Sequence, residues 1–185
     1  MPSDEQIGGA EAAAKPCIDL AKERPDDGPA IEALLDKAFG LDRREKAVYR
    51  LREDLSPIDG LGTVARVDGV LRGSIRYSRV EIGTRATPAL LLGPLAVDPA
   101  VGGAGVGLSL MQHTLAAAKE QGHNIVVLVG DEPYYARVGF SSLSAGKLLI
   151  PGQNEQPRVL ALELNSGALN GVEGIVRPRR NEGAS

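Results

Sequence analysis

The strongest constraint on the fold is a strand, a glycine cluster, a helix and a second strand, in that order, between residues 92 and 140. An apolar strand runs into Val97-Asp98-Pro99, and the next cluster, Gly102 to Gly107, contains four glycines. Apolar residues then recur at helical spacing over Val106 to Gln121, and Ile125 to Val129 is a largely β-branched strand. The first N–H groups of a helix are unpaired, and glycines let a phosphate approach them closely. The segment therefore predicts an α/β fold with a phosphate-binding turn.

Three uses of the glycine cluster have to be compared. A Walker-type loop ends in Gly-Lys-Ser/Thr, but Gly107 is followed by Leu108, and the next lysine is Lys119, so this use is excluded. A dinucleotide-binding fold has a third glycine where Leu108 stands, although Asp131 has the place of an acidic ribose partner. A turn that only packs the helix on the sheet also stays open.

Bulk properties limit the classes of protein to consider. A chain of 185 residues with 43% hydrophobic and 24% charged residues is typical of one soluble domain. A net charge of −3 gives no basic surface for nucleic acid, and no apolar run approaches the ~20 residues that span a membrane. Met1 to Glu5 does not begin a secretory signal, and Cys17 is a single, inert thiol, so a cytoplasmic location is expected. His113 and His123 lack the neighbours of a metal site, so no metal is expected.

Residues 1–16 are expected to form a disordered arm, 17–165 a single domain, and 166–185 a loose tail in which Arg177, Arg179 and Arg180 are solvated. Pro94 cannot donate to a sheet ladder, so strand pairing is expected to fail at Gly93-Pro94. The other predicted helical segments are a helix over 29–39 and a charged stretch over 42–54 with Val48 and Leu51 facing inward. Strands are predicted at 17–22 and 90–97, and a hairpin of 63–67 and 71–80 turns at Asp68-Gly69. Later strands at 147–150 and 159–164 are predicted to be antiparallel.

Two signatures resemble those of a known family. Val97-Asp98-Pro99, followed by three residues, Gly-x-Gly-x-Gly and an apolar helix, resembles motif A of the GNAT family of acetyl-CoA-dependent N-acetyltransferases. Tyr135-Ala136-Arg137-Val138-Gly139-Phe140 resembles the second signature of that family. The fuller forms, Leu92 to Val97 and Gly130 to Tyr135, resemble its YhbS-like branch.

The resemblance implies the GNAT fold, a mixed and twisted α+β sheet that is flanked by helices and split into a V beside Gly93-Pro94. Acetyl-CoA would lie in the V as cosubstrate, and Tyr135 would give a proton to the departing thiolate. Tyr134 would form a wall of the pocket. The pantetheine would pair with the backbone of Leu95, Ala96 and Val97, and the pyrophosphate would bind the loop formed by Gly102, Gly103, Ala104, Gly105, Val106, Gly107 and Leu108.

The implied function is transfer of an acetyl group from acetyl-CoA to a primary amine by direct attack. The alternative from a different class is a non-catalytic acyl-CoA sensor, and relatives are often homodimers. One departure concerns Gly102, because the family usually has Gln or Arg there, so weaker binding of CoA is expected. Leu90 to Leu92 offer no carboxylate as a base, so deprotonation through water is expected; the other carboxylates considered are Asp98, Asp131, Glu132 and Glu81. Residues 31–60 and the strands after Lys147 are expected to build the acceptor pocket.

Overall fold

The computed structural model describes residues 17–45, 49, 51, 55, 57–153 and 158–179. The arm predicted at 1–16, Val48 and Arg180 lie outside these residues. The strands are β1 (Ile18–Lys22), β2 (Thr63–Val67), β3 (Val70–Ile82), β4 (Thr87–Val97), β5 (Ile125–Val129), β6 (Leu148–Leu149), β7 (Val159–Glu163) and β8 (Gly174–Pro178). The α-helices are α1 (Gly28–Phe39), α3 (Val106–Glu120), α4 (Glu132–Tyr135) and α5 (Ser142–Ala145), and the 3₁₀ helices are η1 (Pro25–Asp27), η2 (Leu41–Glu45), η3 (Pro99–Val101) and η4 (Ala136–Val138).

The strands form one mixed sheet in the order β1-β2-β3-β4-β5-β7, and β8 pairs with both β3 and β6. Within that order the β4–β5 pair is parallel and the other pairs are antiparallel. The hairpin of β2 and β3 turns at Asp68-Gly69, where both residues have positive φ angles. This arrangement confirms the predicted α/β (α+β) class and mixed sheet, and it excludes the doubly wound parallel sheet of a dinucleotide-binding fold.

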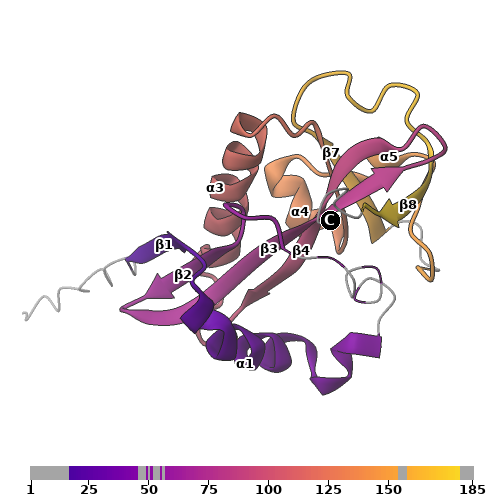
Figure 1. Ribbon diagram of the computed structural model, residues 1–185. Coiled ribbons are helices and arrows are strands. Elements are labelled where there is room, and N and C mark those ends of the chain that lie inside the picture. Colours follow the sequence, from indigo (N-terminus) through magenta and orange to yellow (C-terminus); the bar gives the residue numbers. More distant parts are fainter. Residues whose placement is uncertain are drawn as a thin grey trace, which may run out of the picture.

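Helices cover both faces of the sheet (Figure 1). On one face α3 packs against the hairpin and the centre of the sheet, where Leu110 and Met111 are fully buried. On the other face α1 packs through Ile31 and Leu35 against β2 and β4. At the far end of that second face, residues of α5, β6 and β8 join the same core as the inner strands. Alternate residues of each central strand therefore enter different cores, as the period of a β-strand requires.

Most elements agree with the sequence prediction, and the clearest differences lie after Lys147. The stretch predicted to be helical over 42–54 forms η2 at its start, and Leu51 is buried as predicted. The strand predicted at 147–150 is only β6, and it pairs with β8 in parallel, so the antiparallel pairing predicted for it is wrong. The strand predicted at 159–164 is β7 and runs antiparallel to β5, as expected.

The loose tail predicted from residue 166 is wrong where the chain forms β8. This strand continues the sheet beside β3, where Val80 to Ile82 face Val176 to Pro178, and Val176 is fully buried. The segment after β3 and the start of β8 meet at a pair of glycines. A Cβ on Gly83 would overlap the carbonyl oxygen of Glu173, and a Cβ on Gly174 would come within 2.9 Å of Gly83 Cα. In the sequence the glycines after residue 165 are typical of a loose tail, whereas in the structure Gly174 permits close backbone approach to Gly83. Across the residues that the structure describes, no helix is both long enough and apolar enough to cross a membrane.

Gly73 lets the start of α3 lie directly on the sheet. A Cβ at this position of β3 would come within 2.7 Å of Val106 Cγ1 and 2.9 Å of Leu110 Cδ1. Both side chains are buried, so neither has free space into which it can move.

We predict that Gly73→Ala lowers the free energy of unfolding by about 1 to 3 kcal/mol, as overpacking does in other cores. Urea unfolding of the two proteins measures this difference. Gly28→Ala is the matched control, because a Cβ there meets nothing within 4 Å and the residue lies in the first turn of α1. Equal stability of both variants would contradict the close packing at Gly73.

Candidate functional site

The strands β4 and β5 separate in the middle of the sheet. They pair only at Leu90 with Val126 and at Leu91 with Val127, although β4 continues to Val97. The separation begins just before Gly93-Pro94, where the register between β3 and β4 also shifts; the peptide bond of this dipeptide is cis. The failure of pairing predicted for this dipeptide is confirmed, and beyond it the edge of β4 that faces β5 has no neighbouring strand among the residues that the structure describes.

The last residues of β4 turn backbone groups toward this open edge. In an antiparallel pair, residues with hydrogen bonds to the partner alternate with residues that face away. The Asp98 N–H donates to the Arg72 carbonyl at 2.7 Å, so Ala96, two residues earlier, also faces β3. Leu95 and Val97 therefore direct their N–H and C=O groups into the split. An extended ligand lying there would bond to alternate residues of the predicted set and would pass Ala96.

The glycine cluster lies at the mouth of the split and begins α3. Gly103 and Gly105 both have φ angles of +81°, a conformation that favours glycine, and Gly105 caps the helix. Ser109 N–H donates to the Gly105 carbonyl at 2.9 Å, the first bond of the helix. The N–H groups of residues 106–108 precede that bond, so they belong to the unpaired first turn that attracts anions.

Gly102 and Ala104 use their N–H groups within the turn itself. Gly102 donates to the Pro99 carbonyl at 3.0 Å, and Ala104 donates to the Val101 carbonyl at 3.2 Å. Gly102 has an ordinary φ angle of −55°, and a Cβ there would lie 3.1 Å from the Pro99 oxygen. A side chain at position 102 therefore needs only a small shift of its neighbour.

Asp98 ties the entrance of this loop to both neighbouring layers. Its Oδ1 accepts hydrogen bonds from Lys37 Nζ at 2.6 Å and from the Ala100 N–H at 2.9 Å, and its Oδ2 accepts one from Arg72 Nη1 at 2.7 Å. The side chain is only 8% exposed. The bonds from Lys37, Ala100 and Arg72 hold the pKa of this carboxyl well below its usual range. Asp98 thus joins α1, β3 and the start of η3 through a single carboxylate.

The two adjacent tyrosines of α4 reach toward different parts of the split. A Cβ on Gly107 would overlap the Tyr134 hydroxyl, so that phenol lies against the first turn of α3. A Cβ on Gly130 would overlap the Tyr135 ring, so that ring lies at the end of β5. The two rings meet edge to face at 5.1 Å, and Tyr135 meets Phe140 in the same way at 6.1 Å. Burial raises the pKa of the Tyr134 phenol.

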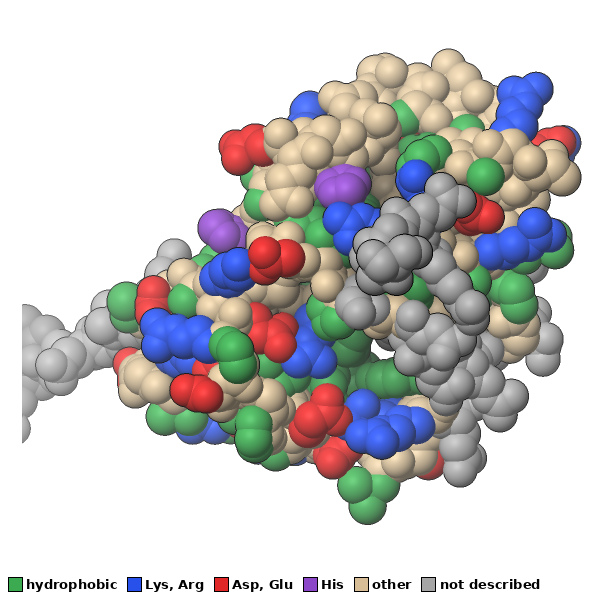
Figure 2. Space-filling model, viewed as in Figure 1, with side chains coloured by type: hydrophobic (Ala, Val, Ile, Leu, Met, Phe, Trp, Pro, Cys, Tyr) green, Lys and Arg blue, Asp and Glu red, His purple; other side chains and the backbone are tan. Residues whose placement is uncertain are grey.

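A cavity of about 370 Å³ adjoins the split on the face of the sheet that α1 covers. On the face shown in Figure 2, the surface is hollowed near α1, with hydrophobic side chains at the bottom and acidic and basic side chains at the lower rim. The described residues that line the cavity are Glu32, Leu35, Arg43, Arg44, Tyr49, Leu55, Pro57, Arg76, Ser78, Gly93 and Pro94. The cavity therefore reaches Gly93-Pro94, the point at which the split opens.

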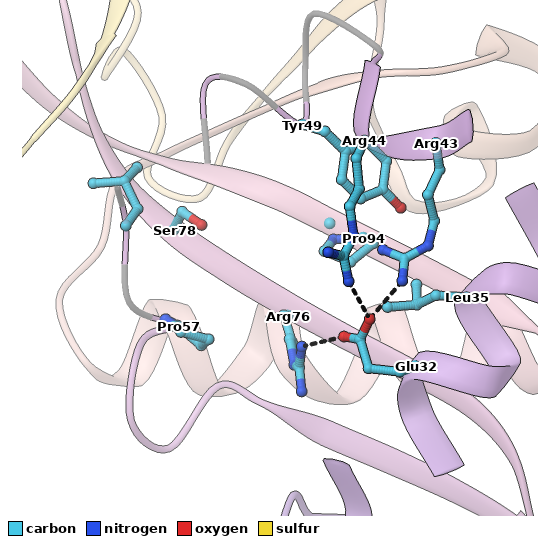
Figure 3. A pocket seen from close by; sticks show the side chains of 11 residues that line it. Glu32, Leu35, Arg43, Arg44, Tyr49, Pro57, Arg76, Ser78 and Pro94 are labelled. Carbon is cyan, nitrogen blue, oxygen red and sulfur yellow. Dashed lines mark hydrogen bonds and ion pairs between the residues drawn. The ribbon is translucent and has the colours of Figure 1, made fainter. Parts of the chain in front are cut away.

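One carboxylate organises the charged groups of this cavity. Figure 3 shows three guanidinium groups turned toward Glu32: those of Arg43, Arg44 and Arg76. Their closest distances to the Glu32 oxygens are 2.5 Å, 3.4 Å and 3.9 Å, respectively. Burial acts to lower the pKa of Arg43, but its bonds to Asp36 and Glu32 outweigh burial, so the pKa lies above its ordinary value.

Part of this cavity could be predicted from the sequence and part could not. Residues 31–60, which are predicted to build the acceptor pocket, contribute most of the lining of this cavity. The strands after Lys147, for which the same is predicted, contribute none of the lining residues that the structure describes. Arg76 and Glu32 come from separate elements, and no local pattern signals their meeting. The four carboxylates considered as bases are absent from the described lining: Asp98, Asp131, Glu132 and Glu81. Glu132 instead accepts bonds from the Ser142 hydroxyl and N–H, which lower its pKa and tie α4 to α5.

Comparison with known proteins agrees with this arrangement. Residues 21–143 match the family model described as an acetyltransferase (GNAT) domain. The uncharacterized N-acetyltransferase YhbS of Escherichia coli K12 is 34% identical over 155 residues, which cover 83% of this chain and 92% of that protein. A crystal structure of Escherichia coli YhbS in complex with CoA has a TM-score of 0.73 at 31% identity, covering 97% of this chain and 94% of the other. An acetyltransferase of Brucella melitensis in complex with acetyl-CoA has a TM-score of 0.65 at 27% identity, over 88% and 96%.

The hydrogen bonds of Asp98 predict a pH dependence of stability. Because the folded pKa is depressed below the unfolded value of about 3.9, the contribution of this carboxylate is complete above about pH 4 and is lost as the pH falls through the folded pKa. We expect Asp98→Asn to be less stable than the original chain at pH 7, with a difference that shrinks as the pH falls below 4.

Thermal unfolding from about pH 7 down to pH 3 measures this difference. Asp59→Asn is the control, because it removes an exposed pair with Lys22 in which the aspartate side chain is 91% exposed. Such surface pairs contribute little to stability, so this variant should change it far less. A constant gap between the original chain and Asp98→Asn over the whole series would contradict the role given to Asp98.

Proposed function

The chain belongs to the GNAT family of acetyltransferases, and we propose that it transfers an acetyl group from acetyl-CoA to a primary amine. The observation that carries the proposal is the open edge of β4 beside the first turn of α3. That edge offers backbone groups to an extended pantetheine, and the helix start offers N–H groups to a pyrophosphate. The structures of two similar proteins with CoA or acetyl-CoA support the same cosubstrate here.

In this proposal the two substrates enter from opposite faces of the sheet. Pantetheine lies along Leu95 and Val97, with the pyrophosphate against Gly103 and residues 105–108, and Tyr134 closes the wall above Gly107. The amine occupies the cavity on the α1 face and meets the thioester beside Gly93-Pro94. Alignment of the two groups then supplies much of the rate, as it does when any bimolecular reaction is made intramolecular.

Charge that develops during the transfer has a partner on each side. The N–H groups at the open edge of β4 donate to the carbonyl oxygen as the amine attacks, in the manner of an oxyanion hole. Tyr135 gives its proton to the departing thiolate, since a phenol still carries its proton at neutral pH. For the ammonium of the substrate, we propose loss of its proton to water, because Glu32, the carboxylate among the described lining residues, already accepts bonds from two arginines.

Binding and turnover test this function directly. Calorimetry with acetyl-CoA and with NAD should show binding of acetyl-CoA alone, and a panel of amines should release free thiol from it. Binding of NAD in place of acetyl-CoA would overturn the proposal. Binding of acetyl-CoA without release of thiol by any amine would instead identify a non-catalytic sensor of acyl-CoA.

We predict that Tyr135→Phe keeps the affinity for acetyl-CoA and slows transfer at least tenfold, because the thiolate loses its proton donor. Gly130→Ala should also slow transfer, since its Cβ would displace the Tyr135 ring. Steady-state rates across a pH series, together with calorimetry, measure both effects. An unchanged rate for Tyr135→Phe at every pH would remove this residue from the mechanism.

We also predict that Gly102→Arg binds acetyl-CoA several-fold more tightly than the original chain. The backbone at this position accepts a side chain, and a guanidinium there adds a charge-assisted bond to the pyrophosphate. Isothermal titration at two salt concentrations measures the gain, which should shrink at the higher one. Gly28→Arg, on α1, adds the same charge elsewhere and should give no gain; an equal gain in both variants would mean that overall charge, rather than the loop, is responsible.

A further inference from the structure

The cavity on the α1 face has many more hydrogen-bond donors than acceptors. Among the lining residues that the structure describes, three arginines face one carboxylate, that of Glu32. Each guanidinium carries five N–H donors and no acceptor, whereas a carboxylate accepts at about four positions. A ligand that fills this cavity must therefore supply acceptors, and this requirement bears on the acceptor substrate of the proposed function.

Two of the three arginines are held in place by carboxylates that lie outside the cavity. Arg76 donates to both oxygens of Glu23, at 2.8 and 2.5 Å, and its side chain is 20% exposed. Arg43 donates to Asp36 at 2.8 Å and is 5% exposed. These carboxylates are outside the lining of the cavity, so they fix the guanidinium groups without filling it.

Arg44 is held differently from its neighbours. Its side chain is 75% exposed, and its hydrogen bond to Glu32 is 3.4 Å long. The same Glu32 oxygen already accepts a bond of 2.5 Å from Arg43. An exposed pair of this length contributes little to stability, so little is lost when Arg44 turns to a ligand.

From this arrangement we propose that the acceptor is a small amine that also carries a carboxylate, and that Arg44 binds this carboxylate. The proposal rests on the proposed function. A guanidinium matches the two oxygens of a carboxylate in a fork, and Arg43 lies beside Arg44 to add a further donor. A volume of about 370 Å³ is near the lower end for ligand sites, so a compound of amino-acid size fits and a folded partner does not.

The cavity also disfavours a purely cationic acceptor. A polyamine would need carboxylates, but Glu32 already accepts bonds from Arg43 and Arg44. The guanidinium groups repel an ammonium and favour its neutral form, which is the form that attacks a thioester. A carboxylate on the same molecule offsets that repulsion and draws the substrate in.

The experiment compares amino acids with their α-amides, and uses spermidine as a polycation, in an assay of thiol release from acetyl-CoA. The best acid should have a kcat/KM at least tenfold above that of its amide. Arg44→Gln should raise KM for the acid at least tenfold with little change in kcat, and should leave both the amide and the affinity for acetyl-CoA unchanged. Arg44→Lys should restore part of the loss, because it keeps the charge without the fork. Arg85→Gln, at an exposed arginine in the turn before β4, is the matched control.

The outcomes separate this inference from the function on which it rests. Preference for spermidine or for the amides, or an unchanged KM in Arg44→Gln, overturns the carboxylate proposal while the transferase stands. If acetyl-CoA binds but no compound is turned over, the amino acids are titrated by calorimetry into both proteins, and equal affinity or no binding overturns the proposal as well. Failure to bind acetyl-CoA is a different result, since it removes the proposed function.

Discussion

The parting of β4 and β5 is the constraint on which the rest of this structure depends. A backbone that leaves its partner in the middle of a sheet has N–H and C=O groups that still require hydrogen bonds. Here those groups belong to Leu95 and Val97, and Gly73 allows α3 to begin directly beside them. The same event thus produces an open strand edge and places the N-terminus of α3, with its unpaired N–H groups, next to it. The cavity on the α1 face opens at the same point of β4, beside Gly93-Pro94.

The parts of this site that could be predicted from the sequence are those built from backbone. Glycines that permit positive φ angles, a proline that cannot donate and the period of a helix are local properties, so Gly103, Gly105 and Pro94 indicate the loop and the break from the sequence alone. The parts that could not be predicted depend on distant residues. Arg76 and its partner Glu23 are 53 positions apart, and the pairing of β8 with β3 depends on the close approach of Gly83 and Gly174, which are far apart in the sequence.

The two halves of the site therefore differ in how readily their chemistry changes. The half proposed for the cosubstrate uses backbone N–H groups and glycines, where most substitutions disturb the fold itself. The half proposed for the acceptor uses side chains from α1, η2 and β3, which can be exchanged while the strands keep their register. Arg44 is the extreme case, because it is largely exposed and contributes little to stability. A shared fold with varied acceptors is the expected result of such a division.

The positions of the tyrosines have a consequence for how this protein can be observed. The chain contains four tyrosines and no tryptophan, so its intrinsic fluorescence comes from tyrosine alone. Tyr134 and Tyr135 lie at the split, Tyr49 lines the cavity on the α1 face, and Tyr77 is buried in the core that Tyr135 packs against. Tyr49, Tyr134 and Tyr135 are thus close to places where a ligand is expected, whereas Tyr77 lies in the core. Binding of a ligand can therefore be followed by tyrosine fluorescence of the unlabelled protein, because no tryptophan emission masks the signal.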